Sequence, residues 1–395
     1  MKKRIFTRAV IILSVVSLLT DISSEMLYPV MPLYLKSIGF SVLLIGILEG
    51  IAEAVAGLSK GYFGKMSDVT GKRVPFVRLG YMLSSVSKPM MGMFVYPVWI
   101  FFARTIDRLG KGIRTSARDA ILSSESTPET KGRVFGFHRG MDTLGAVIGP
   151  LSALVYLNYF PENYRTLFFI AFIPALTGVA FTYLIKDNKK TVFSGNAASE
   201  NKGFFSFLSY WKTSSSEYKK LILGLFAFTL LNSSDIFLLL MLKNYGFSDQ
   251  LIITVYIFYN LVYALASLPI GIIADKIGLK KNYISGLIIF SVVYGGMALN
   301  PGSDFVFVIF FLYGIYAAST EGISKAWITN ICRSEDTATA LGFYTGLNSI
   351  FSLAASAFAG FLWYSYSPGV MFVFSSVGTI AVACYFIYSF RRKKD

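Results

Sequence analysis

Charged residues gather on one face of a segment centred near residue 108, and their types suit the binding of an anion. Five of them fall within an arc of about 100° when the segment is drawn as a helix: Arg104, Asp107, Arg108, Lys111 and Arg118. An arginine binds a carboxylate or a phosphate through two parallel hydrogen bonds, which a lysine cannot reproduce. The same face could instead be neutralised internally, by Asp107 itself, Asp142 and Asp21. The sequence leaves both interpretations open.

Two pairs of acids have the spacing of adjacent helical turns. Asp21 and Glu25 form one pair, and Glu49 and Glu53 form the other. Because two carboxylates close together in a low-dielectric site cannot both ionise easily, one of them tends to hold a proton. These four acids and Asp142 are therefore predicted to take part in proton coupling. A neighbouring arginine would oppose this effect, and the sequence leaves the balance open.

The elements that position these residues are predicted to be membrane-spanning helices. Hydrophobic residues make up 54% of the 395 residues, charged residues make up 15%, and the mean hydropathy is +0.58. A soluble chain of this length is less apolar. Segments long enough to span a bilayer, about 20 mostly apolar residues each, are centred near residues 20, 52, 85, 108, 145, 174, 230, 262, 290, 316, 349 and 379. The predicted fold class is an all-α membrane protein with twelve transmembrane helices.

The net charge of +15 is explained by where the basic residues lie. Lysines and arginines cluster before the first predicted span, in alternate loops, in the central polar stretch and at the C-terminal end, whereas the other loops carry few. This positive-inside asymmetry predicts a multi-pass protein of the cytoplasmic (inner) membrane with both termini in the cytoplasm. The charge therefore needs no nucleic-acid partner.

The sequence contains an internal repeat, whose two copies are offset by about 207 positions. The clearest repeat is a Gly-Asp-Gly-basic motif, with members Gly64, Asp68, Gly71, Lys72 and Arg73 in the first copy and Gly271, Asp275, Gly278 and Lys280 in the second. The repeat predicts two pseudo-symmetric six-helix halves, residues 1–190 and 218–395, joined by a cytoplasmic linker at residues 191–217. Two such halves can rock against each other around a central site, as in many secondary transporters.

Comparison of the two copies identifies charges that the fold does not require. Several ionisable residues have neutral counterparts in the second copy: Glu25 aligns with Asn232, Glu49 with Tyr256, Glu53 with Asn260, Arg139 with Thr345 and Asp142 with Asn348. A charge at the centre of a spanning helix costs at least about 2.5–3.5 kcal/mol. A purely structural role is hard to sustain for so many, so we expect proton coupling or substrate contact.

The second half has its own ionisable residues. Asp235 lies on the seventh predicted span, and Glu321 and Lys325 lie four residues apart on the tenth. Glu321 and Lys325 have the spacing and order of a stabilising helical pair, although they could also belong to a cytoplasmic gate. The residues predicted to contact substrate are Arg104, Asp107, Arg108, Lys111, Arg139, Asn232, Asp235 and Glu321.

Twelve spans in two halves, with the Gly-Asp-Gly-basic motif after the second span and again after the eighth, resemble the major facilitator superfamily. The resemblance covers nearly the whole chain. Gly145-x-x-x-Gly149-Pro150 resembles the antiporter motif of proton-coupled exporters without its last glycine pair, and Asp107–Arg114 is similar to a poorly characterised bacterial branch. The resemblance implies alternating access, a cytoplasmic latch at Asp68 and Asp275, and a cavity-facing Asp235. It does not name a substrate.

The residues and the resemblance together predict a secondary active transporter that exports a small polar or anionic solute in a proton-coupled cycle. The alternatives are a proton-coupled importer of an anionic metabolite or a polycarboxylate of siderophore type, and a membrane receptor without transport. No nucleotide loop, metal-ligand cluster or nucleophile–base arrangement occurs in the sequence, so no enzyme activity, catalytic residue, metal or cofactor is predicted. The expected partners are the solute, protons and the lipid bilayer, and the expected state is a monomer.

Overall fold

The computed structural model describes residues 5–161, 163–187, 203–299 and 302–390, and within these ranges the chain forms helices and no strands. The long helices up to residue 187 are α1 (Arg8–Leu27), α2 (Met31–Ser37), α3 (Val42–Thr70), α4 (Val74–Met93), α5 (Pro97–Ser124), α6 (Lys131–Tyr159) and α7 (Tyr164–Thr182). Those that follow are α9 (Ser216–Leu231), α10 (Ile236–Asn244), α11 (Asp249–Ile277), α12 (Leu279–Ala298), α13 (Gly302–Ile331), α14 (Thr337–Ser365) and α15 (Pro368–Ser389). Residues 191–202 of the predicted linker and the basic residues at both chain ends lie outside the described ranges.

Each predicted span corresponds to a long helix or to a pair of helices separated by a short break. Eight of the described helical segments are long and apolar enough to cross a membrane: α1, α6, α7, the α9–α10 pair, α11, α13, α14 and α15. The other four spans correspond to α3, α4, α5 and α12, and α5 is less apolar because it carries the charged face. The predicted all-α, twelve-span fold class is confirmed.

Two spans are broken at corresponding places. The break between α1 and α2 contains Pro29, which lacks a backbone N–H and ends a helix. The break between α9 and α10 contains no proline and consists of Asn232, Ser233, Ser234 and Asp235. Such short polar side chains compete with the helix for backbone hydrogen bonds, which favours an interruption.

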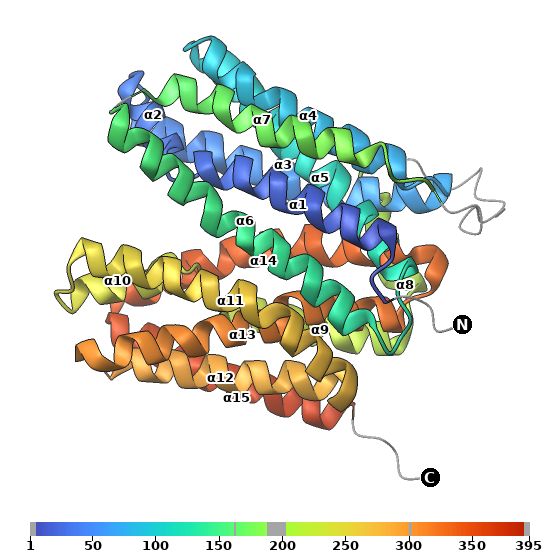
Figure 1. Ribbon diagram of the computed structural model, residues 1–395. Coiled ribbons are helices and arrows are strands. Elements are labelled where there is room, and N and C mark those ends of the chain that lie inside the picture. Colours follow the sequence, from blue (N-terminus) through green and yellow to red (C-terminus); the bar gives the residue numbers. More distant parts are fainter. Residues whose placement is uncertain (1–4, 162, 188–202, 300–301, 391–395) are drawn as a thin grey trace, which may run out of the picture. The chain divides into compact units, whose positions relative to one another are not determined.

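The chain forms two compact units. Unit 1 comprises residues 1–127, 141–213 and 332–347, and unit 2 comprises residues 128–140, 214–331 and 348–395. In unit 1, α5 packs on α3 and α4, and α7 packs on α1 and α4 (Figure 1). The corresponding helices of unit 2 repeat this arrangement, with α13 on α11 and α12 and α15 on α9 and α12. The predicted boundaries at residues 190 and 218 stay a prediction, because these units follow spatial contacts rather than the sequence repeat.

The described end of the linker, residues 203–213, packs on unit 1. It contains a short 3-10 turn (Ser206–Ser209) and α8 (Tyr210–Thr213). The Phe207 side chain is fully buried, and its ring lies so close to Gly61 of α3 that a side chain at Gly61 would collide with it. Trp211 stacks on Phe343, with ring centroids 5.9 Å apart. This part of the linker is therefore anchored to unit 1.

Candidate functional site

The charged face of α5 is buried within unit 1. Arg104, Asp107 and Arg108 each expose 9% or less of their surface, whereas Lys111, on the next turn, is exposed. α5 packs between α3 and α4, so the charged groups on its face meet polar side chains of those two helices. The buried charges must therefore find their partners there.

Two turns of α3 pair with two turns of α5. The Arg104 guanidinium forms a two-pronged contact with the Glu49 carboxylate, with Nε–Oε1 and Nη2–Oε2 distances of 2.8 Å each. One turn later, Arg108 Nη1 lies 3.0 Å from Glu53 Oε1, and Arg108 Nη2 lies 3.8 Å from Glu49 Oε2. Glu49 and Glu53 were predicted to take part in proton coupling, and Arg104 and Arg108 were predicted to contact substrate. In the structure these acids and arginines are ion-pair partners of each other. We call these four residues, together with Asp107 of α5 and Lys88 of α4, the ionic network.

Lys88 completes the ionic network and was missed by the sequence analysis. Its side chain is 1% exposed, and its ammonium donates to Asp107 Oδ1 at 2.9 Å and to Ser24 Oγ at 3.2 Å. The other oxygen of Asp107 lies 3.4 Å from Arg104 Nη1. The sequence signal was available, because Lys88 is one of two charges in α4, and the other, Arg78, lies near the start of that helix. Internal neutralisation was one of the two interpretations of this face, and here it uses Glu49, Glu53 and Lys88 together with Asp107.

Asp21 of α1 and Asp142 of α6 form a separate carboxyl pair in unit 1. Their carboxyl groups lie close enough to act electrostatically on each other, and Asp142 Oδ1 accepts a bond of 2.7 Å from Ser17 Oγ. α6 approaches α1 closely here, because a side chain at Gly145 would lie 2.8 Å from the Asp21 Cβ atom. Arg118, the last member of the charged face, donates to Ser17 Oγ at 3.1 Å. The structure therefore brings together two acids that are 121 positions apart in the chain.

Glu25 and Lys111 differ from the residues of the ionic network. Among the residues that the structure describes, neither side chain has a hydrogen-bond or ion-pair partner. The Lys111 ammonium is nevertheless near enough to act electrostatically on Asp21, Glu25 and Glu53. Among the described residues, unit 1 thus contains a set of paired charges and, beside it, one cation and one acid, Lys111 and Glu25, without a countercharge in direct contact.

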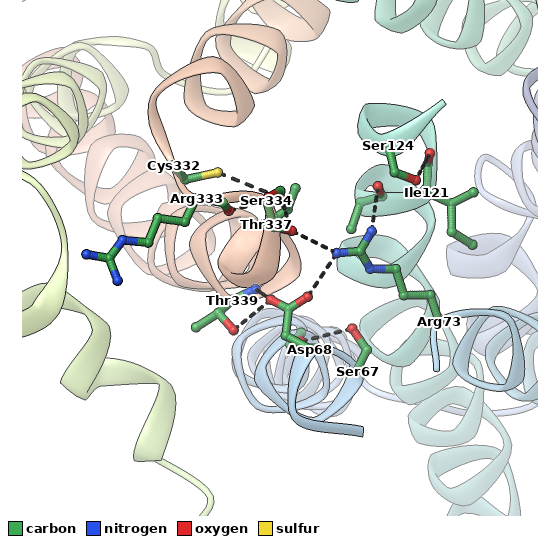
Figure 2. A network of polar contacts seen from close by, with 12 residues as sticks. Ser67, Asp68, Arg73, Ile121, Ser124, Cys332, Arg333, Ser334, Thr337 and Thr339 are labelled. Atoms are coloured by element: carbon green, nitrogen blue, oxygen red, sulfur yellow. Dashed lines mark hydrogen bonds and ion pairs between the residues drawn. The ribbon is translucent and has the colours of Figure 1, made fainter. Parts of the chain in front are cut away.

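The first Gly-Asp-Gly-basic motif joins the end of α3 to the start of α14, within unit 1 (Figure 2). The Asp68 carboxylate accepts from the Thr339 backbone N–H at 2.7 Å, from the Thr339 hydroxyl at 2.9 Å and from Arg73 Nη2 at 3.2 Å. A carboxylate at a helix N-terminus is stabilised by the unpaired N–H groups and the helix dipole. Gly64 permits the approach, because a side chain there would lie 2.4 Å from the Ala338 carbonyl oxygen.

The second motif makes the equivalent contact in unit 2. The Asp275 carboxylate accepts from the backbone N–H groups of Gly132 at 2.7 Å and Arg133 at 3.1 Å, in the first turn of α6. Arg133 Nε also donates to it at 2.7 Å. Gly271 permits this close approach, because a Cβ atom at its position would lie 2.4 Å from the Gly132 carbonyl oxygen.

The remaining motif residues shape the helix ends. Gly71 and Gly278 end α3 and α11 with φ values of 63° and 99°, which favour glycine. Lys280 Nζ donates to the Phe390 carbonyl oxygen at 2.9 Å, whereas Lys72 is exposed.

Unit 2 holds the other predicted substrate residues in two places. Glu321 Oε2 lies 3.8 Å from Arg139 Nη2 of α6, so Glu321 has an ion-pair partner outside its own helix. Arg139 Nε also donates to the Tyr263 hydroxyl. Asp235, at the break before α10, accepts hydrogen bonds from the hydroxyls of Tyr259 and Tyr313. These tyrosines carried no sequence signal, because they lie 24 and 78 positions from Asp235.

Comparisons with known proteins agree with this architecture. The family model described as Major Facilitator Superfamily matches residues 13–258 and 221–395. The chain is 34% identical over 380 residues to an uncharacterised MFS-type transporter of Methanocaldococcus jannaschii, covering 95% of this chain and 93% of that protein. It is 25% identical over 188 residues to citrate exporter 1 of Aspergillus niger, covering 46% of this chain and 34% of the exporter. The crystal structure of the human organic anion transporter MFSD10 superposes with a TM-score of 0.82 at 16% identity, covering 96% of this chain and 99% of that one.

Proposed function

The chain belongs to the major facilitator superfamily, a family of multi-pass membrane transporters rather than enzymes, and from this premise we propose that it exports a small polar or anionic solute in exchange for protons. The observation that carries the proposal is the contrast within unit 1 between the ionic network and the charges beside it. The ionic network is internally neutralised, so the transported species are expected to act on Asp21, Asp142, Glu25 and Lys111.

The Asp21–Asp142 pair is the proposed proton carrier. Two carboxyl groups close together in a low-dielectric site cannot both ionise easily, so one of them tends to hold a proton, and the ionised partner makes its removal costly. Releasing that proton would leave two adjacent carboxylates. A neighbouring cation or a conformational change must then offset the repulsion between their negative charges. Lys111 and Arg118, the latter through Ser17, supply cations near the pair. Glu25, one turn from Asp21, is the second candidate.

Lys111 is the proposed contact for an anionic group of the solute. Its ammonium is exposed and has no partner among the described residues, so binding an anion there breaks no existing ion pair. Arg108 adjoins it one turn earlier, and its buried Nε–H has no acceptor in the described structure. Two of the similar proteins, a citrate exporter and an organic anion transporter, support an anionic solute.

The contacts of Asp68 and Asp275 support a role as latches in alternating access. Each binds the first turn of a helix from the opposite sequence half, so each contact must change if the halves rock against each other. Export is supported by the partial antiporter motif on α6 and by the citrate exporter. We place the protein in the cytoplasmic membrane with both termini in the cytoplasm, because of the positive-inside pattern.

Proton coupling is tested in proteoliposomes loaded with radiolabelled citrate, and with other small carboxylates in parallel, under an imposed pH gradient. An acidic exterior should accelerate efflux from vesicles containing the wild-type protein, with protons entering at the same time. Asp142→Asn should retain efflux down the solute gradient but lose its response to pH, because a carboxamide cannot carry the proton. Asn348→Ala, at the equivalent position of the second half, is the matched control and should retain the response. Wild-type efflux that ignores the pH gradient would overturn the proposed coupling.

A further inference from the structure

The acid at the break between α9 and α10 has an unusual set of partners. The two oxygens of the Asp235 carboxylate accept hydrogen bonds from different tyrosines, from Tyr259 Oη of α11 at 2.6 Å and from Tyr313 Oη of α13 at 2.5 Å. These bonds fix the orientation of the carboxylate, because each oxygen is held separately. Asp235 as a residue is only partly buried.

No cationic side chain neutralises this carboxylate among the residues that the structure describes. Asp275 and Glu321, by contrast, each contact an arginine. Two hydroxyl donors offset part of the cost of removing a carboxylate from water, but they supply no countercharge. A charge held in this way is complementary to a cation supplied from outside the chain.

The walls around Asp235 are aromatic. Tyr259 and Tyr313 contact each other edge to face, with centroids 5.2 Å apart, and Tyr256 and Tyr316 extend the cluster at 5.4 and 5.3 Å. The face of an aromatic ring attracts a cation through its quadrupole, most strongly where water is excluded. An organic ammonium group is attracted both by the Asp235 carboxylate and by the aromatic rings. A strongly hydrated inorganic ion interacts less favourably with the rings.

A second polar atom at the same break lacks a partner. The side-chain oxygen of Asn232, three residues before Asp235, is buried and accepts no hydrogen bond from any described residue. An unsatisfied buried acceptor costs free energy that an external N–H donor would recover. An ammonium group carries such donors in addition to its charge.

We propose that the break between α9 and α10 is a binding site for the ammonium group of a small organic cation, formed by Asp235, Asn232 and the rings of Tyr259 and Tyr313. Asp235 forms the ion pair, the rings of Tyr259 and Tyr313 lie beside the cation, and Asn232 accepts an N–H bond. The site lies in unit 2 and uses none of the residues that the proposed function assigns to protons or to the anionic solute, although the sequence predicted that Asn232 and Asp235 contact substrate. It therefore stands whether or not the proposed proton-coupled export is correct.

The first test compares two probes of the same shape on the purified full-length protein. Isothermal titration calorimetry at constant pH and ionic strength would measure binding of benzylammonium and of benzyl alcohol, which lacks the charge. Because a hydrogen bond to a charged group is worth about 1.5–3 kcal/mol, the ammonium should bind at least about tenfold more tightly. Equal binding of the two probes, or no binding of benzylammonium, would overturn the proposal without any variant.

The second test assigns the binding to Asp235. Asp235→Asn should weaken benzylammonium binding by about tenfold or more and leave benzyl alcohol unchanged. Tyr294→Phe is the matched control, because the Tyr294 hydroxyl pairs with Ser233 at the same break and does not contact Asp235. Wild-type affinity in folded Asp235→Asn protein would overturn the site. Asp142→Asn should bind benzylammonium like the wild type, so a failure of proton coupling remains distinguishable from a failure of this site.

Discussion

The α3–α5 contact of unit 1 and the α11–α13 contact of unit 2 are equivalent in the repeat but differ in chemistry. In unit 1 the contact is ionic, with Glu49 bound by the two-pronged guanidinium of Arg104. The residues at the corresponding positions in unit 2 are Tyr256 and Phe310. Both rings pack on Tyr259, with centroid distances of 5.4 and 6.2 Å.

This difference shows that the helix pair needs a filled interface and not a charged one. Replacing a buried ion pair by apolar side chains is often neutral or stabilising, because the desolvation of two charges offsets their attraction. The second copy of the repeat has made that replacement. The ions of unit 1 therefore contribute something other than packing, which agrees with a function in transport.

The largest effect is expected from breaking one ion pair without replacing it. Arg104→Phe leaves Glu49 without its two-pronged partner and should destabilise the protein by about 3 kcal/mol, the low end for a broken buried pair because the Glu49 side chain is 31% exposed. Adding Glu49→Tyr installs the residues of the second copy and should recover most of the loss. Thermal unfolding in detergent measures both. A double variant no more stable than the single one would show that the two contacts are not interchangeable.

The two latch acids allow a closer comparison of the units. Asp68→Asn and Asp275→Asn each weaken charge-assisted bonds to an arginine and to a helix N-terminus, so each should cost about 1.5–3 kcal/mol and reduce flux. Expression, thermal unfolding and flux would be measured together. Lys72→Ala, an exposed neighbour in the same motif, should change stability by less than about 0.5 kcal/mol. Normal flux from well-expressed Asp68→Asn protein would remove the latch assignment.

A smaller effect, on affinity alone, is expected at Lys111. Its counterpart in the second copy is Ala317, so Lys111→Ala should be tolerated by the fold. The loss of one charged contact should weaken binding of an anionic solute by about tenfold, or about 1.4 kcal/mol, while the melting temperature stays unchanged. Lys111→Arg should retain most of the affinity. Unaltered solute affinity in the alanine variant would exclude Lys111 from the binding site.

The smallest effect is expected from removing equivalent hydroxyl groups in the two units. Ser17 donates to Asp142, and Thr229 donates to Asn348, the counterpart of Asp142, at 2.7 Å in both cases. Ser17→Ala and Thr229→Val should each cost about 1 kcal/mol of stability. Only Ser17→Ala should also change the pH dependence of transport, because only its partner is ionisable. Identical transport in the two variants would argue against the asymmetry between the units.

Much of the fold could be predicted from the sequence. Eight of the twelve spans follow from local apolar composition, which is a property of about 20 consecutive residues and needs no tertiary information. The other four carry more polar residues, and their prediction rested on the internal repeat as well. The repeat of Gly64, Asp68 and Gly71 located both helix ends where the motif makes its contacts. The break at Pro29 has a local cause, because proline lacks the backbone N–H that a helix uses. The break at Asn232–Asp235 was not predicted, since no single residue there forbids a helix.

The candidate site was only partly predictable. The sequence by itself determined which charges share a helix face, because the spacing along a helix fixes that, and it separated the charged copy from the neutral one. Only the tertiary structure decided the partners. It paired Arg104 and Arg108 with Glu49 and Glu53, joined Asp21 to Asp142, and gave Asp235 two tyrosines. The physical reason is that a helix can turn any of its faces toward a neighbour, and the packing of α3, α4 and α5 within unit 1 selects the face.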